Sequence, residues 1–188
     1  TGLSEINMKN YHRILSLDSA MAVVQFDKDG TEYQRKYFIS YPDSVMVMKF
    51  TANKKGKQNL VLSYCPNSEA ESYLSADGNN GLGYTGVLNN NKMKFAFRIK
   101  ALHKGGILKT ENSQIIVKDA DEVVFLLTAD TDYKINFNPD FNDPQTYVGK
   151  DPEQTTLAMM NNALEKGYDE LIRNHKTDYT ALFNRVQL

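Results

Sequence analysis

The sequence predicts a mainly β fold, an antiparallel β-sandwich followed by C-terminal helices. Up to residue 137, short apolar segments alternate with turn residues about every eight to twelve positions, a spacing typical of sandwiches. No helical periodicity interrupts this part of the chain. Beyond residue 151, apolar residues recur at the spacing of one face of an amphipathic helix. A chain of 188 residues buries roughly 70% of its unfolded surface, which is enough for a hydrophobic core.

The first strands are predicted as two pairs, over residues 20–27 and 31–41 and over residues 44–52 and 59–65. Asp29 and Gly30 separate the first pair and tolerate the positive φ angles that a two-residue hairpin turn requires. The second pair is joined by the polar sequence NKKGKQ, with Gly56 as its flexible point. We therefore expect each pair to form a hairpin.

The later strands are predicted from alternation and apolar content. In residues 93–101, the apolar set Phe95, Phe97, Ile99 and Ala101 alternates with Lys94, Ala96, Arg98 and Lys100. This period of two indicates a strand with one face in the core and the other largely in solvent. Residues 107–110 and 113–119 are further strands, and residues 121–130 are nearly all apolar, so we expect that last strand to be buried on both faces.

The helical region follows a crossing rich in Pro, Asn and Asp. Asp151 can cap the helix, Pro152 suits its first turn, and Gln154 completes a capping box. The apolar stripe consists of Leu157, Met160, Leu164, Tyr168 and Leu171. Gly167 indicates a kink or break, and Thr177 is expected to cap a final helix. That helix has its own stripe at Tyr179, Leu182, Phe183 and Val186.

The composition disfavours several classes of function. The net charge is −1 with both signs interspersed, so no basic patch favours nucleic acid or an anionic membrane. No apolar run approaches the roughly 18 residues of a membrane-spanning helix, and the first residues do not resemble a signal peptide. The single cysteine, Cys65, has no partner for an internal disulfide and is expected to be a small buried hydrophobic residue.

Candidate motifs for metal or cofactor binding are better explained by structural roles. The Gly-rich residues 78–86 lack the Lys-Ser/Thr of a phosphate loop and predict a turn beside a strand. His12, His103 and His175 are far apart in sequence, which favours surface or packing roles. The acidic clusters lack the ligand pattern of a calcium-binding EF-hand, and turn-forming bonds of Asp and Asn explain them. We expect no metal and no cofactor.

Sugar chemistry leaves more than one possibility open. The 23 Asp and Glu residues offer too many pairs for choosing two hydrolytic carboxylates from sequence. Trp, the preferred platform for stacking on sugars, is absent, whereas 11 Tyr are present. Tyr33, Tyr37 and Tyr41 recur along one predicted strand, where packing is favoured. The loop at 138–150 has residues that would suit the rim of a sugar site, but a solvated crossing is favoured.

Longer stretches of the chain resemble the N-terminal β-domain of family 95 glycoside hydrolases, the α-L-fucosidase family common in gut Bacteroidetes. The resemblance begins with Tyr11, Arg13 and Leu17-Asp18 and continues through YQRKYFISYPDSVMVMKFTA, DGNNGLGYTG, KGG and DADEVVFLLTADTDY. It ends in YDELIRNHKTDYTALFNRVQL, with His175, Asp178-Tyr179, Leu182-Phe183 and Arg185-Val186. Nearly the whole chain is covered.

This resemblance implies a supersandwich-type domain that precedes a catalytic (α/α)6 barrel. Residues 1–137 would form a sandwich that is incomplete at its N-terminal side, residues 138–151 a loop crossing, and residues 152–188 a helical linker towards the barrel. The family hydrolyses α-linked L-fucose, or L-galactose in some members, with inversion, using a Glu as general acid and a water activated by Asn and Asp. Those groups belong to the barrel and match no position here, so we expect no catalytic residue in this chain.

The function implied is that of a non-catalytic domain that supports and orients the barrel of the same polypeptide, whose substrate is a fucosylated or L-galactosylated oligosaccharide. The alternatives are an independent carbohydrate-binding module and a structural domain of another polysaccharide-processing protein. The parent is expected to be periplasmic or secreted. Because the family's opening segment is absent and the chain lacks an initiator Met, we expect an excised domain with unpaired strand edges, which forms a homodimer through an edge or through its C-terminal helix.

Overall fold

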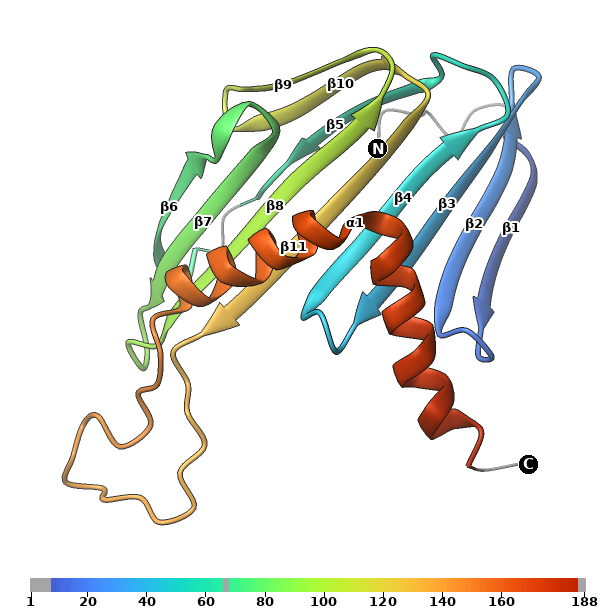
Figure 1. Ribbon diagram of the computed structural model, residues 1–188. Coiled ribbons are helices and arrows are strands. Elements are labelled where there is room, and N and C mark those ends of the chain that lie inside the picture. The colour runs from blue at the N-terminus through green and yellow to red at the C-terminus, as the bar shows by residue number, and fades with distance from the viewer. Residues whose placement is uncertain (1–7, 66–67, 186–188) are drawn as a thin grey trace.

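The computed structural model describes residues 8–65 and 68–185 and shows two antiparallel sheets and one long helix in these ranges (Figure 1). The larger sheet has eight strands in the order β1-β2-β3-β4-β11-β8-β7-β6, and the smaller has three in the order β5-β10-β9. The strands are β1 (Lys9–Ser16), β2 (Met21–Lys28), β3 (Thr31–Ser40), β4 (Val45–Ala52), β5 (Gln58–Ser63), β6 (Ala70–Ala76), β7 (Gly81–Leu88), β8 (Lys94–Lys104), β9 (Ile107–Glu111), β10 (Gln114–Ala120) and β11 (Glu122–Thr131). They are followed by α1 (Pro152–Phe183). This architecture confirms the predicted mainly β sandwich with a helix at its C-terminal side.

The first hairpin forms as the sequence predicts. β2 and β3 pair from Ala22↔Tyr37 to Lys28↔Thr31, and the turn between them places Asp29 at φ 50° and Gly30 at φ 67°. Positive φ at both central residues is the geometry of a type I′ turn, whose twist matches that of the flanking strands. The local Asp-Gly pair is therefore sufficient to predict this pairing.

The second predicted hairpin is wrong. β4 pairs with β3 and β11, whereas β5 pairs with β10 in the smaller sheet. The linker between β4 and β5 carries the chain from one sheet to the other, and there Gly56 N donates to Asp121 Oδ1 at 2.7 Å. A polar loop of this length can join strands within a sheet or between sheets, so the sequence alone does not distinguish the two arrangements.

The Gly-rich residues 78–86 form a short 3-10 turn, η1 (Gly78–Asn80), and most of β7. The predicted turn beside a strand is therefore correct, but the glycines continue into the strand itself. A Cβ atom at Gly81 would lie 2.8 Å from the carbonyl oxygen of Ile99 and 2.9 Å from that of Asp77. Glycine is needed at this position because the backbone of the neighbouring strand approaches so closely.

Two hydrophobic cores lie on opposite faces of the larger sheet. The core between the two sheets contains Phe50, Leu82, Ile99, Ile115, Val123 and Phe125. The core between the larger sheet and α1 contains Phe38, Val47, Val124, Leu126, Met160 and Leu171. Consecutive residues 123–126 of β11 thus alternate between the two cores, and each is at most 5% exposed. This confirms the prediction that the strand is buried on both faces.

β8 differs from its prediction because α1 covers the face that was expected to be in solvent. Ala96 is only 3% exposed, and α1 packs against β8 and β11. The cations on this face have a carboxylate partner: Arg98 Nη1 and Lys100 Nζ lie 3.2 and 2.9 Å from the carboxylate oxygens of Asp77. A charged strand face can lie beside a helix when its charges are paired in this way.

The helix begins at the predicted cap and bends at the predicted glycine. Asp151 caps α1 and accepts a hydrogen bond from Glu153 N at 3.0 Å, with Pro152 in the first turn. Gly167 has φ 70° and ψ 174°, which is not helical, so α1 consists of two segments that meet there. The first segment crosses β8 and β11 on the outer face of the larger sheet, and the second runs towards the end of the β1–β4 part (Figure 1).

Two details of the helical prediction are wrong. Thr177 lies inside the second segment rather than at the start of a separate helix. Leu157 is 42% exposed, and the buried stripe runs instead through Thr156, Met160, Ala163 and Leu171. Thr156 is tolerated in this stripe because its hydroxyl donates to the Pro152 carbonyl oxygen at 2.8 Å. Val186 of the predicted final stripe lies outside the described residues.

Candidate functional site

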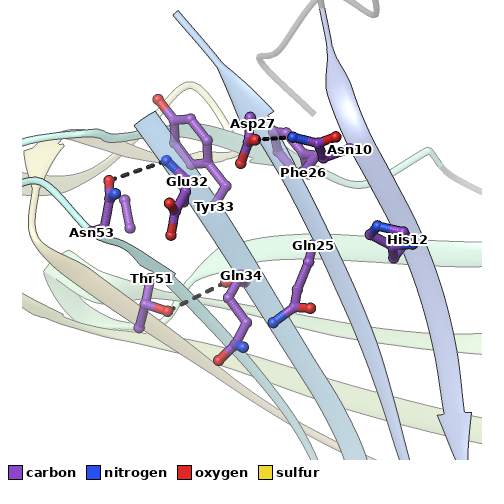
Figure 2. Close-up of a pocket in the computed structure, with 11 residues that line it drawn as sticks. Asn10, His12, Gln25, Phe26, Asp27, Glu32, Tyr33, Gln34, Thr51 and Asn53 are labelled. Atoms are coloured by element: carbon purple, nitrogen blue, oxygen red, sulfur yellow. Dashed lines mark hydrogen bonds between the residues drawn. The ribbon is translucent and has the colours of Figure 1, made fainter. Parts of the chain in front are cut away.

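A hollow lined by polar side chains lies on the outer face of the larger sheet, across β1 to β4 (Figure 2). We call it the polar hollow. Its hydrogen-bonding residues are Asn10, His12, Gln25, Asp27, Glu32, Tyr33, Gln34, Thr51 and Asn53. Its volume is about 410 Å³, which falls within the roughly 300–1,000 Å³ of typical small-molecule sites.

The strand register explains why these side chains gather. Gln25 pairs with His12 on one side and with Gln34 on the other, and Gln34 pairs with Thr51. Residues that face each other across neighbouring strands point to the same side of the sheet. One polar row therefore crosses four strands. Asp27 lies two residues after Gln25 on β2, and Glu32 lies two residues before Gln34 on β3, where the two residues pair with each other.

Hydrogen bonds fix the rim of the polar hollow. Asn10 stands at a bulge in β1 with φ 50°, and its Nδ2 donates to Asp27 Oδ2 at 2.6 Å. On the other side, the backbone N of Glu32 donates to Asn53 Oδ1 at 3.1 Å (Figure 2). Burial and the nearby carboxylate of Asp29 raise the pKa of Tyr33, so its phenol remains protonated near neutral pH.

An apolar groove lies where the end of the β1–β4 part of the sheet meets the second segment of α1. It is lined by Leu15, Ala20, Ala22, Tyr37, Phe38, Ile39, Tyr41, Met46, His175, Asp178 and Tyr179 and has a volume of about 430 Å³. Leu15, Ile39 and Tyr41 are 69%, 66% and 83% exposed. Such a concentration of exposed apolar side chains is typical of an interaction surface.

Stacked rings connect this groove to the end of α1. His175 stacks on Phe38 with a ring separation of 4.9 Å, Tyr179 stacks on His175 at 6.4 Å, and Phe183 stacks on Tyr179 at 5.3 Å. His175 Nε2 lies 3.1 Å from the Ser19 carbonyl oxygen, and because a carbonyl only accepts, Nε2 carries the proton. His175 thus has a packing role, as expected, and holds α1 against the turn between β1 and β2.

Asp43, in the turn between β3 and β4, anchors both segments of α1. Its carboxylate accepts hydrogen bonds from Lys166 Nζ at 2.8 Å, from Asn174 Nδ2 at 3.2 Å and from Ser40 Oγ at 2.5 Å. Burial alone would raise the pKa of this carboxyl, but the bonds from Lys166, Ser40 and Asn174 outweigh it and lower the pKa. Lys166 and Asn174 lie on opposite sides of Gly167, so Asp43 fixes the bend.

A long loop at residues 132–150 projects from the sheet between β11 and α1 (Figure 1). Asp140 Oδ1 accepts from Asn142 N at 2.9 Å, and Asp143 Oδ1 accepts from Gln145 N at 2.8 Å. These bonds confirm the predicted turn-forming role for the acidic residues of this loop. Phe137 and Phe141 are 94% and 83% exposed, which indicates a second surface suited to contact with another domain.

Cys65 does not have the environment that was predicted for it. Its side chain is exposed, so the prediction of a buried hydrophobic residue is wrong. β5 ends at Ser63, so Cys65 lies outside the strand. Among the described residues, no group of three or more His, Cys, Asp or Glu side chains is placed to hold a metal ion.

The tyrosines divide between packing and exposure. Tyr33 stacks on Phe26 at a ring separation of 5.1 Å, and Tyr37 meets Phe50 edge-on at 6.0 Å. Packing is therefore confirmed for these two, whereas Tyr41 follows the end of β3 and borders the apolar groove. Within the residues that the structure describes, no helix is long and apolar enough to cross a bilayer.

Comparisons with known proteins find a matching domain family and two similar proteins. The family model for the glycosyl hydrolase family 65 N-terminal domain matches residues 2–136. The chain is 30% identical over 196 residues to a probable alpha-fucosidase A of Aspergillus niger, covering 99% of this chain and 24% of that protein. It is 24% identical over 210 residues to alpha-L-fucosidase 2 of Arabidopsis thaliana, covering 95% of this chain and 23% of that protein. The chain thus spans about a quarter of the length of these relatives.

The fold is also similar to that of a solved structure. A putative kojibiose phosphorylase from the human microbiome superposes with a TM-score of 0.63 at 11% identity, covering 95% of this chain and 25% of that one. Identity this low supports a shared fold and nothing more about chemistry.

Proposed function

The chain belongs to the glycosyl hydrolase family 65 N-terminal domain family, and from this we propose that it is the non-catalytic β-domain of an α-L-fucosidase-like enzyme. The names of its relatives in Aspergillus niger and Arabidopsis thaliana support the fucosidase assignment. The matching model carries the family 65 name, whereas the sequence resembles family 95, so membership of family 95 is part of the proposal. The substrate would be a fucosylated or L-galactosylated oligosaccharide, hydrolysed with inversion.

One observation supports this role: bonds of Asp43 and His175 hold α1 against the sheet, while the end of α1 and the loop at 132–150 project from it. Both extend beyond the strands on the same side of the molecule (Figure 1). Leu182 near the end of the helix is 58% exposed, and Phe137 in the loop is 94% exposed. Two exposed apolar elements on one side suit a domain that packs against a catalytic barrel and orients it.

The geometry of the polar hollow also fits a non-catalytic role. Its carboxylates, Asp27 and Glu32, face each other on adjacent strands of one sheet face. An inverting glycosidase needs its two carboxyl groups roughly 6.5–9.5 Å apart, whereas directly opposite residues in an antiparallel pair have Cβ atoms only about 4.5–5.5 Å apart. Asp27 is also engaged by Asn10.

An activity assay on two proteins tests this function. The 188-residue chain and a longer polypeptide that includes the region after it are each incubated with fucosyl-α-1,2-galactose. We expect only the longer polypeptide to release fucose, and NMR of the fresh product should show the β-anomer first, as inversion requires. Hydrolysis by the short chain would contradict the non-catalytic role. A longer polypeptide that cleaves other glycosides but not fucosides would contradict the fucosidase assignment.

An independent carbohydrate-binding module is the second candidate, and the polar hollow is the observation that favours it. This candidate requires affinity for a glycan without any catalytic domain. The same two proteins distinguish the candidates. Glycan binding by the short chain, together with no fucose release by the longer polypeptide, would favour the binding module.

A further inference from the structure

We propose that the polar hollow binds a neutral oligosaccharide. The chemical class of ligand is inferred from the side chains of the hollow, while the choice of a fucosylated sugar rests on the proposed function. The site would allow the β-domain to hold a glycan chain in addition to supporting a barrel.

The central observation is a pair of primary amides with unused hydrogen-bonding capacity. Gln25 and Gln34 face each other across β2 and β3, and both side chains are half-buried. Neither side-chain amide bonds to another group among the described residues, although the Gln34 carbonyl oxygen of the backbone accepts from Thr51. Each amide offers two donors and one acceptor, and two amides held side by side can bond to the hydroxyls of one sugar ring.

The groups around these amides are already fixed. Asn10 is bonded to Asp27, and Asn53 is bonded to the backbone of Glu32. A rim that is ordered before binding loses little side-chain entropy when a ligand arrives. The amide nitrogen of Asn53 and the carboxylate of Glu32 then remain to meet the ligand at one side of the amide pair.

Charge decides the class of ligand. Among the residues that the structure describes, the lining contains the carboxylates of Asp27 and Glu32 and no lysine or arginine. Phosphate, sialic acid or uronic acid groups would therefore meet repulsion and no cation to pair with. A neutral polyhydroxylated ligand can donate its hydroxyls to the carboxylates and exchange bonds in both directions with the amides.

The test is an NMR titration of the 188-residue chain with the neutral trisaccharide fucosyl-α-1,2-galactosyl-β-1,4-glucose. We expect saturable amide shifts centred on Gln25, Gln34, Thr51 and Asn53. Because every hydrogen-bonding side chain of the hollow is exposed or half-buried, the dissociation constant should lie in the millimolar range. Gln25→Ala and Gln34→Ala should each weaken binding about three- to tenfold, as expected for the loss of one or two hydrogen bonds.

Three controls make the result specific. Gln145→Ala removes an exposed amide from the loop at 132–150 and should leave the affinity unchanged. Gln34→Met keeps the length of the side chain and removes both its donors and its acceptor, so it should weaken binding even if an alanine variant folds poorly. A sialylated trisaccharide should bind more weakly than the neutral one.

Absence of saturable shifts, shifts centred elsewhere, or unchanged affinity in the Gln25 and Gln34 variants would overturn the inference. Equal binding of the sialylated sugar would overturn the neutral class. The binding site and the proposed function can be refuted independently. If the longer polypeptide hydrolyses fucosides but nothing binds at the hollow, only the binding site is refuted. If a glycan binds but no fucoside is hydrolysed, only the fucosidase assignment is refuted.

Discussion

At the scale of single residues, Asp43 shows how one buried carboxylate can hold two parts of a helix. The side chain of Asp43 is 2% exposed, and its partners Lys166 and Asn174 are 123 and 131 positions away in sequence. A buried carboxylate is tolerated only when such bonds replace its lost hydration. Asp43 is therefore both a connection between the sheet and α1 and a source of pH-dependent stability.

Asp43→Asn tests this contribution. Removing the charge should lower the free energy of unfolding by about 1.5–3 kcal/mol at neutral pH, the range for hydrogen bonds to charged groups. The folded-state pKa of Asp43 is lowered, so its stabilisation is present above the unfolded-state pKa and is lost as the pH falls through the folded-state pKa. Urea unfolding at several pH values should therefore show the difference between wild type and variant shrinking on acidification.

Asp18→Asn is the matched control, because Asp18 is an exposed aspartate in the turn between β1 and β2. It should change the free energy of unfolding by less than about 0.5 kcal/mol. If the effect of Asp43→Asn stays the same from neutral pH into strong acid, the ionised carboxylate is not the source of the stability.

Gly81 illustrates a steric requirement rather than a conformational one. Gly81→Ala would bring a Cβ to 2.8 Å from the Ile99 carbonyl oxygen, which as part of the backbone cannot easily move aside. We expect a loss of about 1–3 kcal/mol in the free energy of unfolding. Gly83→Ala on the same strand is the control, since its nearest contacts would be side-chain atoms at 3.5 Å. Equal effects at the two positions would indicate that strand propensity, not space, explains the glycines.

At the scale of elements, the bend at Gly167 decides where α1 ends. Its φ of 70° and ψ of 174° lie in a region that is essentially restricted to glycine. A Cβ at Gly167 would have no atom of residues 8–65 or 68–185 within 4 Å, so any cost of adding one comes from the backbone conformation.

Gly167→Ala should therefore lower the free energy of unfolding by about 1–3 kcal/mol, the cost of a non-glycine residue in this region. Thermal unfolding followed by circular dichroism measures it. Asn161→Ala, at an exposed position of the first segment, should be neutral or slightly stabilising because alanine favours helix. A Gly167→Ala variant as stable as the wild type would mean that the two segments can join without the bend.

The same elements show what the sequence can and cannot predict. The β2–β3 hairpin can be predicted from the sequence because Asp29 and Gly30 lie between the strands they join. The sequence does not predict the sheet to which β5 belongs. β5 pairs with β10, and this pairing buries Leu60 in a core that strands distant in sequence form together. Gln25 and Gln34 belong to predicted strands, yet their meeting depends on pairing register, which alternation alone does not supply.

At the scale of the whole molecule, one of the two exposed apolar surfaces lies where the sheet and the second segment of α1 meet. Ile39 and Tyr41 lie at the apolar groove, and Leu182 lies near the end of the helix. In an enzyme of the proposed kind, the catalytic barrel would cover this side. Without a barrel, the most available partner of similar chemistry is a second copy of the chain.

We therefore expect the 188-residue chain to form a dimer at high concentration in light scattering, through the apolar groove and the end of α1. Ile39→Lys should restore the monomer, because it places a charge in the centre of the contact. Ile107→Lys is the matched control: Ile107 is 65% exposed against 66% for Ile39, but it lies on β9 of the smaller sheet, so the dimer should persist. A wild-type chain that remains monomeric contradicts the prediction. If Ile107→Lys alone dissociates the dimer, the interface lies on the smaller sheet instead. A longer polypeptide with its barrel in place should not associate through this surface, since the same apolar side chains would already be buried within one chain.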